Sequence, residues 1–315
     1  MRRRALGRSG IELPVIVFGG NVFGWTADRA ASFRLLDACL EHGLIAIDTA
    51  DVYSTWAPGH VGGESEAMIG AWLKERPGAR DRVLILTKCG MKMPDGTGLS
   101  PAWIATACEA SLRRLGVERI DLYQAHKDDE TVPLADTLGA FGRLIGQGKV
   151  RAIGASNYPA ARLAAALGLA GSGALPRFES CQPRYNPLER GIEGDIVPLC
   201  LSEEVGIIGY SALASGFLSG KYRSAADLSK SPRGERYVAG LLTPRGFAVL
   251  DAVGRVAARH GAAMASVALA WQIAKPGITA PIASATSLQQ LEELVAGATL
   301  ALSPADIAEI DAAGD

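Results

Sequence analysis

The stretch IAIDTADVYS (residues 45–54) joins a short aliphatic run to Asp48 and, five residues later, to Tyr53. Two later runs also end on an ionisable residue: VLILTK (83–88), which closes on Lys88, and IDLYQAH (120–126), which closes on His126. A buried strand favours Val, Ile and Leu, so an ionisable group at its C-terminal end calls for a functional reason. If the three strands are parallel neighbours, their ends meet at one face, and we expect the four polar side chains to converge there.

Aliphatic runs alternate with amphipathic helical patterns along most of the chain. The remaining runs are VIVFGG (15–20), VRAIGAS (150–156), FESCQ (178–182), IIGYSA (207–212) and ITAPIAS (278–284). Helical periodicity separates the runs, for example over 30–43, 64–76 and 100–116. About eight strands that alternate with helices indicate parallel pairing with right-handed crossovers. We therefore predict an α/β fold, a (β/α)8 TIM barrel, formed by a single domain over residues 1–315.

An open, doubly wound sheet is the competing architecture. Its dinucleotide site carries the pattern GxGxxG directly after the first strand. Here the first strand leads into FGGNVFGW (18–25), whose glycine spacing does not match that pattern. The barrel is therefore the preferred prediction.

Three segments fall outside the strand-helix repeat. Residues 3–14 read as an N-terminal β-hairpin that turns at Ser9-Gly10, and we expect it to plug the floor of the barrel. The stretch 214–240 is too long for an ordinary connection, which makes it either a functional lid or a disordered segment. The end of the chain, SPADIAEIDAAG (303–314), predicts extra C-terminal helices.

Composition limits the classes of partner. The chain has 315 residues, is 48% hydrophobic and carries a formal net charge of -1, so it can bury a core and offers no basic surface for nucleic acid. Its five cysteines are scattered without metal-site spacing, as is typical of a reducing compartment. Glu12 and Pro14 interrupt any signal-like apolar run, and the apolar run at 265–274 is too short to span a bilayer. We expect a cytoplasmic protein that binds neither nucleic acid nor membrane, as a monomer or simple homo-oligomer.

Ordered motifs along nearly the whole chain resemble the aldo-keto reductase family. These motifs are IDTADVYS with GGESEAMIG (62–70), LTKCG (86–90), DLYQAH (121–126), IGASN (153–157), QPRYNPLER (182–190), IIGYSALASGFLSGKY (207–222) and PIASATSLQQLEEL (281–294). The resemblance implies reduction of an aldehyde or ketone, or the reverse oxidation, by hydride transfer from NAD(P)H. The carbonyl compound would then be a small molecule.

The resemblance also implies a catalytic tetrad of Asp48, Tyr53, Lys88 and His126. Tyr53 would be the general acid or base, and its ordinary pKa near ~10 makes it a weak donor at neutral pH. We expect the ammonium of Lys88 to lower the pKa of Tyr53, while Asp48 keeps Lys88 in place and charged. His126 would donate a hydrogen bond to the carbonyl oxygen of the substrate.

By the same resemblance, the cofactor would lie across the strand ends. Ser156, Asn157 and Gln182 would bind the carboxamide, and Tyr210 would stack on the nicotinamide ring. The segment around the pyrophosphate would comprise Ser211, Leu213, Ser215 and Gly216, with Lys221 and Arg223 as candidate phosphate contacts or solvated charges. The adenosine end would meet Ser284, Thr286 and Gln290.

The adenosine end departs from the family pattern. Relatives carry Lys or Arg where this chain has neutral residues between Ser284 and Gln290, and Leu294 replaces an Asn that meets adenine. Neutral donors lack the stronger charge-assisted bonds to the 2′-phosphate of NADPH. A helix N-terminus or an arginine of the 214–240 segment (Arg223, Arg233 or Arg236) remains available for that phosphate. We predict NADPH as cofactor, with NADH possible.

Trp25 and Trp56 follow the first and second strands, and we expect them, with the segment 126–133, to wall the substrate pocket; scaffold packing is the alternative. Two other functions stay open. One is a cofactor-binding, redox-sensing regulatory subunit of the channel-β type. The other is an unrelated barrel lyase or hydrolase that uses Lys88 as a Schiff-base nucleophile, which leaves Gln182 and Tyr210 unexplained.

Overall fold

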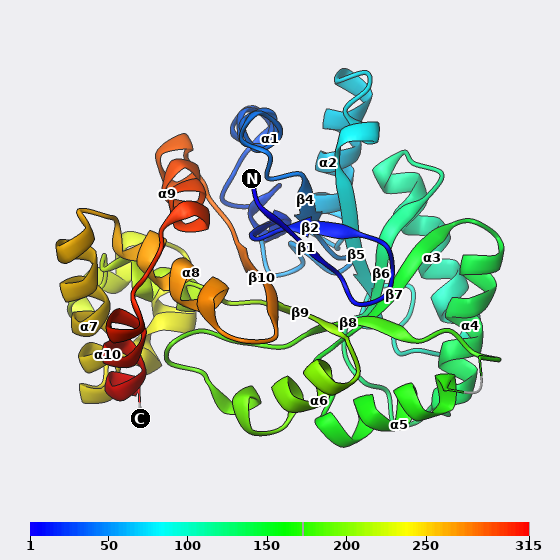
Figure 1. Cartoon of the computed structure of the whole chain (residues 1–315). Helices are drawn as coiled ribbons and strands as arrows, with labels where there is room; N and C mark the ends of the chain where they lie inside the picture. Colours follow the sequence, from blue (N-terminus) through cyan, green and yellow to red (C-terminus); the bar gives the residue numbers. More distant parts are fainter. Residues whose placement is uncertain (172, 315) are drawn as a thin grey trace.

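Eight parallel strands close into a barrel in the computed structural model, which describes residues 1–171 and 173–314. The strands are β3 (Val17–Gly19), β4 (Ala46–Asp48), β5 (Leu84–Cys89), β6 (Ile120–Ala125), β7 (Val150–Ser156), β8 (Phe178–Gln182), β9 (Gly206–Gly209) and β10 (Ile278–Ala283). They pair in the order β10-β3-β4-β5-β6-β7-β8-β9, with all neighbours parallel (Figure 1). The predicted TIM barrel is therefore confirmed, and each of the eight runs overlaps one strand.

Helices follow the strands and cover the outside of the barrel. They are α1 (Arg29–His42), α2 (Glu64–Glu75), α3 (Pro101–Leu115), α4 (Leu134–Gly146), α5 (Ala160–Ala170), α6 (Ile196–Ser202), α7 (Pro244–His260), α8 (Met264–Ala274), α9 (Leu288–Thr299) and α10 (Pro304–Gly314). Local sequence sets their ends. The Ser100 hydroxyl caps α3 by accepting from the backbone N–H of Trp103, with Pro101 at the first helical position, and Gly116 ends the helix in the left-handed conformation.

The interior of the barrel changes from apolar to polar along the strands. An apolar layer contains Ala46, Leu86, Leu122, Ala152, Ile208 and Ala280. Side chains two residues apart on a strand point to the same face. The next inward position toward the C-terminal end is Asp48 on β4, Lys88 on β5 and Gln124 on β6. The apolar layer therefore closes the barrel below, and a polar layer faces the C-terminal mouth.

The N-terminal hairpin plugs the floor of the barrel, as predicted. Its strands are β1 (Arg3–Ala5) and β2 (Glu12–Pro14), which pair antiparallel. Leu6, Ile11 and Leu13 are buried in the same cluster as the apolar layer. The hairpin thus completes a core that the strands alone leave open at their N-terminal ends.

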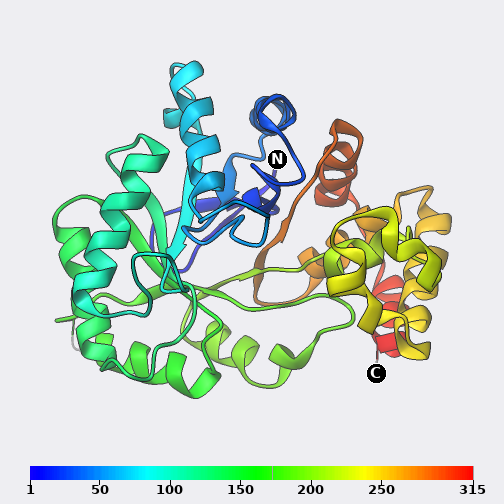
Figure 2. The same cartoon turned by 180° about the vertical axis from the view of Figure 1, so that it is seen from behind.

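The segment 214–241, called the lid below, has structure of its own. It contains the short helical turns η4 (Ala214–Ser219), η5 (Ala225–Lys230), η6 (Gly234–Val238) and η7 (Ala239–Leu241). Figures 1 and 2 show the lid together with α7, α8 and α10 on one side of the barrel. The sequence analysis left open whether this segment is a lid or is disordered, and the helical turns favour an ordered segment.

Two helices add to the eight-fold repeat. The helix α7 precedes the last strand, α10 follows α9, and the two pack against each other. The Arg259 guanidinium binds the Asp306 carboxylate at 2.7 Å across this contact. The prediction of extra helices at the C-terminus is thus confirmed by α10. The second additional helix, α7, lies before β10 in the chain. None of the described helices has both the length and the apolar character that crossing a membrane requires.

Replacing a plug residue tests the role of the hairpin. We expect Leu13→Ala to lower the free energy of unfolding by about 2–5 kcal/mol, because the fully buried side chain would leave a cavity in the core. Glu12→Ala, on the exposed face of the same strand, should change it by less than about 0.5 kcal/mol. Urea unfolding of both variants measures the difference. A loss of unfolding free energy in Leu13→Ala as small as that in Glu12→Ala would show that the hairpin is not part of the core.

Candidate active site

The three strands β4, β5 and β6 are adjacent and bring the predicted residues together. Asp48 ends β4, Lys88 lies near the end of β5, and His126 directly follows β6. The Lys88 ammonium donates to the Asp48 carboxylate at 2.6 Å and to the phenolic oxygen of Tyr53 at 2.9 Å. The Tyr53 hydroxyl also contacts the Asp48 carboxylate, at 3.3 Å, and the ring of Tyr53 meets the ring of His126 edge-on at 5.9 Å. The predicted convergence is therefore present in the structure.

The ion pair at the centre of this group is buried. The Lys88 side chain has no exposed surface and that of Asp48 has 1%. Burial lowers the pKa of the Lys88 ammonium, and the Asp48 carboxylate raises it. The backbone carbonyl of Thr49 accepts a further hydrogen bond from Lys88 at 2.7 Å. Lys88 therefore directs its hydrogen bonds to Asp48, Thr49 and Tyr53.

The pKa of Tyr53 shifts in the opposite direction from the one expected. Burial and the Asp48 carboxylate raise the pKa of the phenol well above its usual value. The expected net lowering of this pKa by Lys88 is wrong for this site, because burial is the largest influence on the phenol and the Asp48 carboxylate adds to it. Tyr53 consequently stays protonated throughout the neutral pH range.

His126 is neutral in this site. Burial and the Lys88 ammonium lower the pKa of the imidazole well below its usual value. Its Nδ1 atom is buried and has no hydrogen-bond partner among the described residues. A neutral imidazole next to Tyr53 can donate one hydrogen bond without bringing a second positive charge beside Lys88.

Two amide side chains hold the second oxygen of Asp48. Gln182 donates to Asp48 Oδ1 at 2.9 Å, and Gln124 donates to the same atom at 3.4 Å. Gln124 was missed by the sequence analysis. Gln124 lies on β6, two residues before His126, and its side chain therefore points to the same inward face. This spacing is the sequence signal that could have identified Gln124 as a site residue.

The residues predicted to bind the carboxamide form one hydrogen-bonded group. The Ser156 hydroxyl donates to the backbone carbonyl of Gln182 at 2.9 Å, and the Asn157 amide donates to the backbone carbonyl of His126 at 2.9 Å. The hydroxyl of Tyr210 donates to the side-chain oxygen of Asn157 at 2.8 Å. The structure thus links this group to His126.

A cavity of about 920 Å³ opens beside Asp48 and Tyr53. Among the predicted residues, its walls include Asp48, Tyr53, Trp25, Trp56, Tyr210, Ser211, Leu213, Ser215, Gly216, Ser284, Thr286 and Gln290. The cavity wall does not include Lys88, His126, Ser156, Asn157 or Gln182, and the predicted wall segment 126–133 does not border the cavity. The cavity therefore runs from the phenol of Tyr53 to the start of α9, and the lid forms part of its wall.

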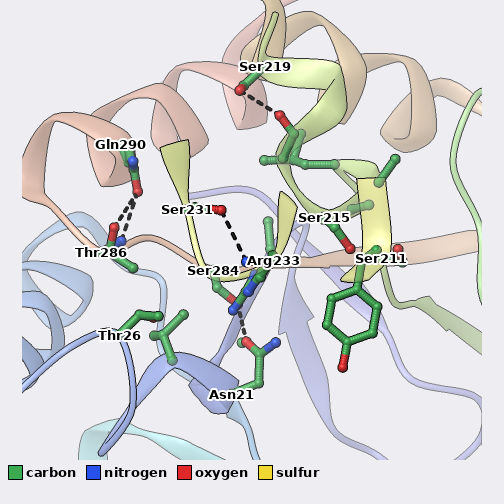
Figure 3. A pocket seen from close by; sticks show the side chains of 18 of the residues that line it. Asn21, Thr26, Ser211, Ser215, Ser219, Ser231, Arg233, Ser284, Thr286 and Gln290 are labelled. Carbon is green, nitrogen blue, oxygen red and sulfur yellow. Dashed lines mark hydrogen bonds between the residues drawn. The ribbon is translucent and has the colours of Figure 1, made fainter. Parts of the chain in front are cut away.

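The far end of the cavity has neutral residues at Ser284, Thr286 and Gln290, as the sequence indicated, and Glu293 of α9 adds an acidic side chain to its wall. Figure 3 shows Thr286 and Gln290 facing each other and Ser284 beside Asn21. The Gln290 side-chain oxygen accepts from the Thr286 hydroxyl at 3.1 Å and from its backbone N–H at 2.8 Å. The Ser287 hydroxyl caps α9 by accepting from the backbone N–H of Gln290. A helix N-terminus therefore borders this end of the cavity.

Comparison with known proteins covers nearly the whole chain. The Aldo/keto reductase family model matches residues 15–315. The oxidoreductase YrpG of Bacillus subtilis (strain 168) is 30% identical over 305 residues, which span 94% of this chain and 91% of that protein. The L-glyceraldehyde 3-phosphate reductase of Escherichia coli O157:H7 is 30% identical over 323 residues, 99% of this chain and 92% of that one. A Schizosaccharomyces pombe protein named as a voltage-gated potassium channel subunit beta is 33% identical over 313 residues, 93% of this chain and 86% of that one.

The buried ion pair makes a prediction about stability. We expect Lys88→Met to lower the free energy of unfolding by about 3–5 kcal/mol, because it leaves the Asp48 charge buried without a cation. Adding Asp48→Asn should recover most of this loss, since the remaining amide carries no charge. Urea unfolding of the single and double variants measures the coupling. A double variant as unstable as Lys88→Met would contradict the assignment of the loss to an unpaired charge.

Proposed function

The chain belongs to the aldo/keto reductase family, and from that membership we propose that it reduces an aldehyde or ketone to the alcohol, or runs the reverse reaction, with NADPH. The observation that carries the proposal is the position of Tyr53. Its hydroxyl contacts both Lys88 and Asp48, and its side chain borders the large cavity. A proton donor at the wall of a ligand-sized cavity is what carbonyl reduction requires.

Tyr53 acts as the general acid in the reductive direction. Its raised pKa suits this role, because the phenol must be protonated before the carbonyl oxygen can receive its proton. The hydrogen bond from Lys88 to the phenolic oxygen stabilises the phenolate that remains after transfer. In the oxidative direction the same oxygen accepts the proton of the alcohol.

His126 orients the substrate. Because its imidazole is neutral, it donates a hydrogen bond to the carbonyl oxygen and supports the negative charge that develops there. The edge-on contact with the Tyr53 ring keeps the two donors beside each other. Two hydrogen bonds to one oxygen fix the carbonyl carbon in a single position.

The residues that line the cavity fit a dinucleotide. When bound, the nicotinamide supplies the hydride, which no protein side chain can provide. We assign the carboxamide to Ser156, Asn157 and Gln182 and the nicotinamide ring to Tyr210. The pyrophosphate is assigned to Ser211, Leu213, Ser215 and Gly216 with Lys221, whose side chain lies against Gly216 so closely that an added Cβ would be 3.1 Å from its Nζ.

NADPH is the proposed cofactor despite the neutral adenosine site of Ser284, Thr286 and Gln290. The N-terminus of α9 borders this end of the cavity, and helix N-termini bind phosphate through free backbone N–H groups and the helix dipole. NADH remains the alternative, because no basic side chain of the Ser284–Leu294 segment supports a 2′-phosphate.

A redox-sensing regulatory subunit is the second candidate function, favoured by the similarity to the S. pombe channel subunit. Assay of NADPH consumption against small aldehydes, aromatic aldehydes, keto-steroids and sugars separates the two. Turnover with any of them supports the enzyme; cofactor binding without turnover supports the subunit. We also propose a cytoplasmic location, since all five cysteines are free and buried.

Tyr53→Phe tests the proton donor. We expect the variant to lose at least about 100-fold in kcat, because it lacks the only proton that the Tyr53 ring can transfer. Its affinity for NADPH, followed by protein fluorescence, should stay within about threefold of wild type, since a phenyl ring fills the same space. Retention of most activity would assign proton transfer to another group.

Gln290→Glu tests the cofactor choice. A glutamate can keep the hydrogen bond that Gln290 accepts from the Thr286 backbone, and it adds a negative charge beside the proposed 2′-phosphate site. We expect the ratio of kcat/KM for NADPH over NADH to fall about tenfold or more from a wild-type value above one.

Gln289→Glu is the matched control, since it adds the same charge one residue earlier on α9. A smaller loss in this variant would assign the effect to position 290 rather than to charge in general. A wild-type protein that turns over faster with NADH would overturn the choice of NADPH.

A further inference from the structure

Gln124 lies at the centre of the barrel and has no part in the reaction proposed above. The strand register places it on β6 between Lys88 of β5 and Gly154 of β7, at the level of the polar layer. Its side chain has no exposed surface. A buried amide must satisfy two N–H donors and an oxygen, so its hydrogen-bond partners indicate what it does.

A glycine on the neighbouring strand gives Gln124 access to β8. A Cβ atom at Gly154 would lie 3.1 Å from the Cγ atom of Gln124 and 2.1 Å from the hydroxyl of Ser180. Because β7 has no side chain here, the amides of Gln124 on β6 and Gln182 on β8 meet across it. The Gln182 nitrogen donates to the Gln124 oxygen at 3.2 Å. Two strands that are not neighbours are thereby joined inside the barrel.

Both N–H groups of the Gln182 amide are engaged inside the barrel. The nitrogen donates to Asp48 Oδ1 at 2.9 Å and to the Gln124 oxygen at 3.2 Å, and a primary amide has only two N–H groups. Gln182 is 2% exposed, and its side-chain oxygen receives no hydrogen bond from the described residues. A bound ligand can therefore use only the oxygen of this amide, and the ligand must supply the donor.

The charge of Asp48 fixes the direction of both amides. Oδ1 of Asp48 accepts from the Gln182 nitrogen and, at 3.4 Å, from the Gln124 nitrogen, while Oδ2 accepts from Lys88 at 2.6 Å. With its nitrogen toward Asp48, Gln124 presents its oxygen to Gln182. A reversed Gln182 amide would set its oxygen against the carboxylate and the Gln124 oxygen, and all three groups are acceptors. Gln124 thus supplies the second acceptor that keeps the amide of Gln182 in one orientation.

We propose that Gln124 is a positioning residue, which holds the oxygen of Gln182 toward the carboxamide of the cofactor. In this orientation the oxygen accepts a hydrogen bond from the carboxamide N–H2 group. A carboxylate in the same place would set an anion against an acceptor and leave both without a hydrogen. The protein therefore selects the amide form of the dinucleotide over the nicotinic acid form. This inference rests on the proposed function, since there Gln182 is assigned to the carboxamide.

Binding of three ligands to Gln124→Met tests the proposal. They are NADP⁺, its nicotinic acid analogue and 2′-phospho-ADP-ribose, which has no pyridine ring. By calorimetry we expect wild type to bind NADP⁺ at least about tenfold more tightly than the acid. In Gln124→Met the affinity for NADP⁺ should fall about 5- to 30-fold, because one N–H of Gln182 loses its acceptor and the amide can turn. The preference for the amide should then drop below about threefold, and the affinity for 2′-phospho-ADP-ribose should change less than about twofold.

A second variant disturbs Gln124 without removing its amide. Gly154→Ala places a methyl group against Gln124, and Ser180→Ala in the same chain removes the hydroxyl that this methyl group would otherwise meet. We expect this double variant to lower the preference for NADP⁺ over the acid at least about threefold, since hydrogen bonds weaken steeply when their geometry is disturbed. Urea unfolding checks that each variant is folded.

Thr137→Val is the matched control. It also removes a hydrogen bond of 3.4 Å from a buried side chain, on α4 and outside the cavity wall. It should leave the three affinities unchanged. An equal loss of affinity for all three ligands in both Gln124 tests would overturn the proposal, because it would indicate a general distortion of the barrel. A preference for NADP⁺ that stays at the wild-type value would overturn it as well.

A double-mutant cycle with Gln182→Met tests whether Gln124 acts through Gln182. If so, the chain with both substitutions should bind NADP⁺ within about twofold of Gln182→Met alone, and two losses that multiply would overturn the proposal. These measurements need no turnover. A wild-type preference that Gln124→Met abolishes, in a protein that reduces no carbonyl compound, would refute the proposed reaction alone. Turnover in wild type with unaltered binding in Gln124→Met would refute the inference alone.

Discussion

The buried ion pair between Lys88 and Asp48 is the interaction on which the rest of the site depends. Neither charge is tolerated in the interior of the barrel without the other. Their neighbours are arranged accordingly: Gln182 and Gln124 donate to the free oxygen of Asp48, and the Thr49 carbonyl and the Tyr53 hydroxyl accept from Lys88. The position of Tyr53 at the cavity is thus a consequence of satisfying a buried charge.

The barrel makes this arrangement possible because its interior is divided into layers. Apolar side chains, closed from below by the hairpin, exclude water from the lower half. The next inward positions carry the polar groups, and strand ends in a parallel barrel all open on one side. The lid then covers this side, so that the cavity has a floor made by strands and a wall made by residues 230–233. The proposed chemistry is assigned to the residues at the strand ends.

Much of this could be predicted from residue order. The eight aliphatic runs located the strands, and the polar residues at three strand ends located Asp48, Lys88 and His126. Gln124 was missed because a single glutamine inside a strand does not indicate a site until the neighbouring strands, and with them Asp48, are placed beside it. The net shift of the Tyr53 pKa was predicted in the wrong direction, since the sequence does not show the burial of the phenol, which is the largest influence on this pKa.

The sequence by itself determined the alternation of strands and helices and the place of Asp48, Lys88 and His126 at strand ends, because these depend on local periodicity and on motifs a few residues long. Only the tertiary structure decided which polar groups become partners. Lys88 and Asp48 are 40 residues apart and pair, and Gln182, 134 residues from Asp48, donates to the second oxygen of that carboxylate. Burial and pairing are properties of three-dimensional neighbours, and no local pattern in the sequence encodes them.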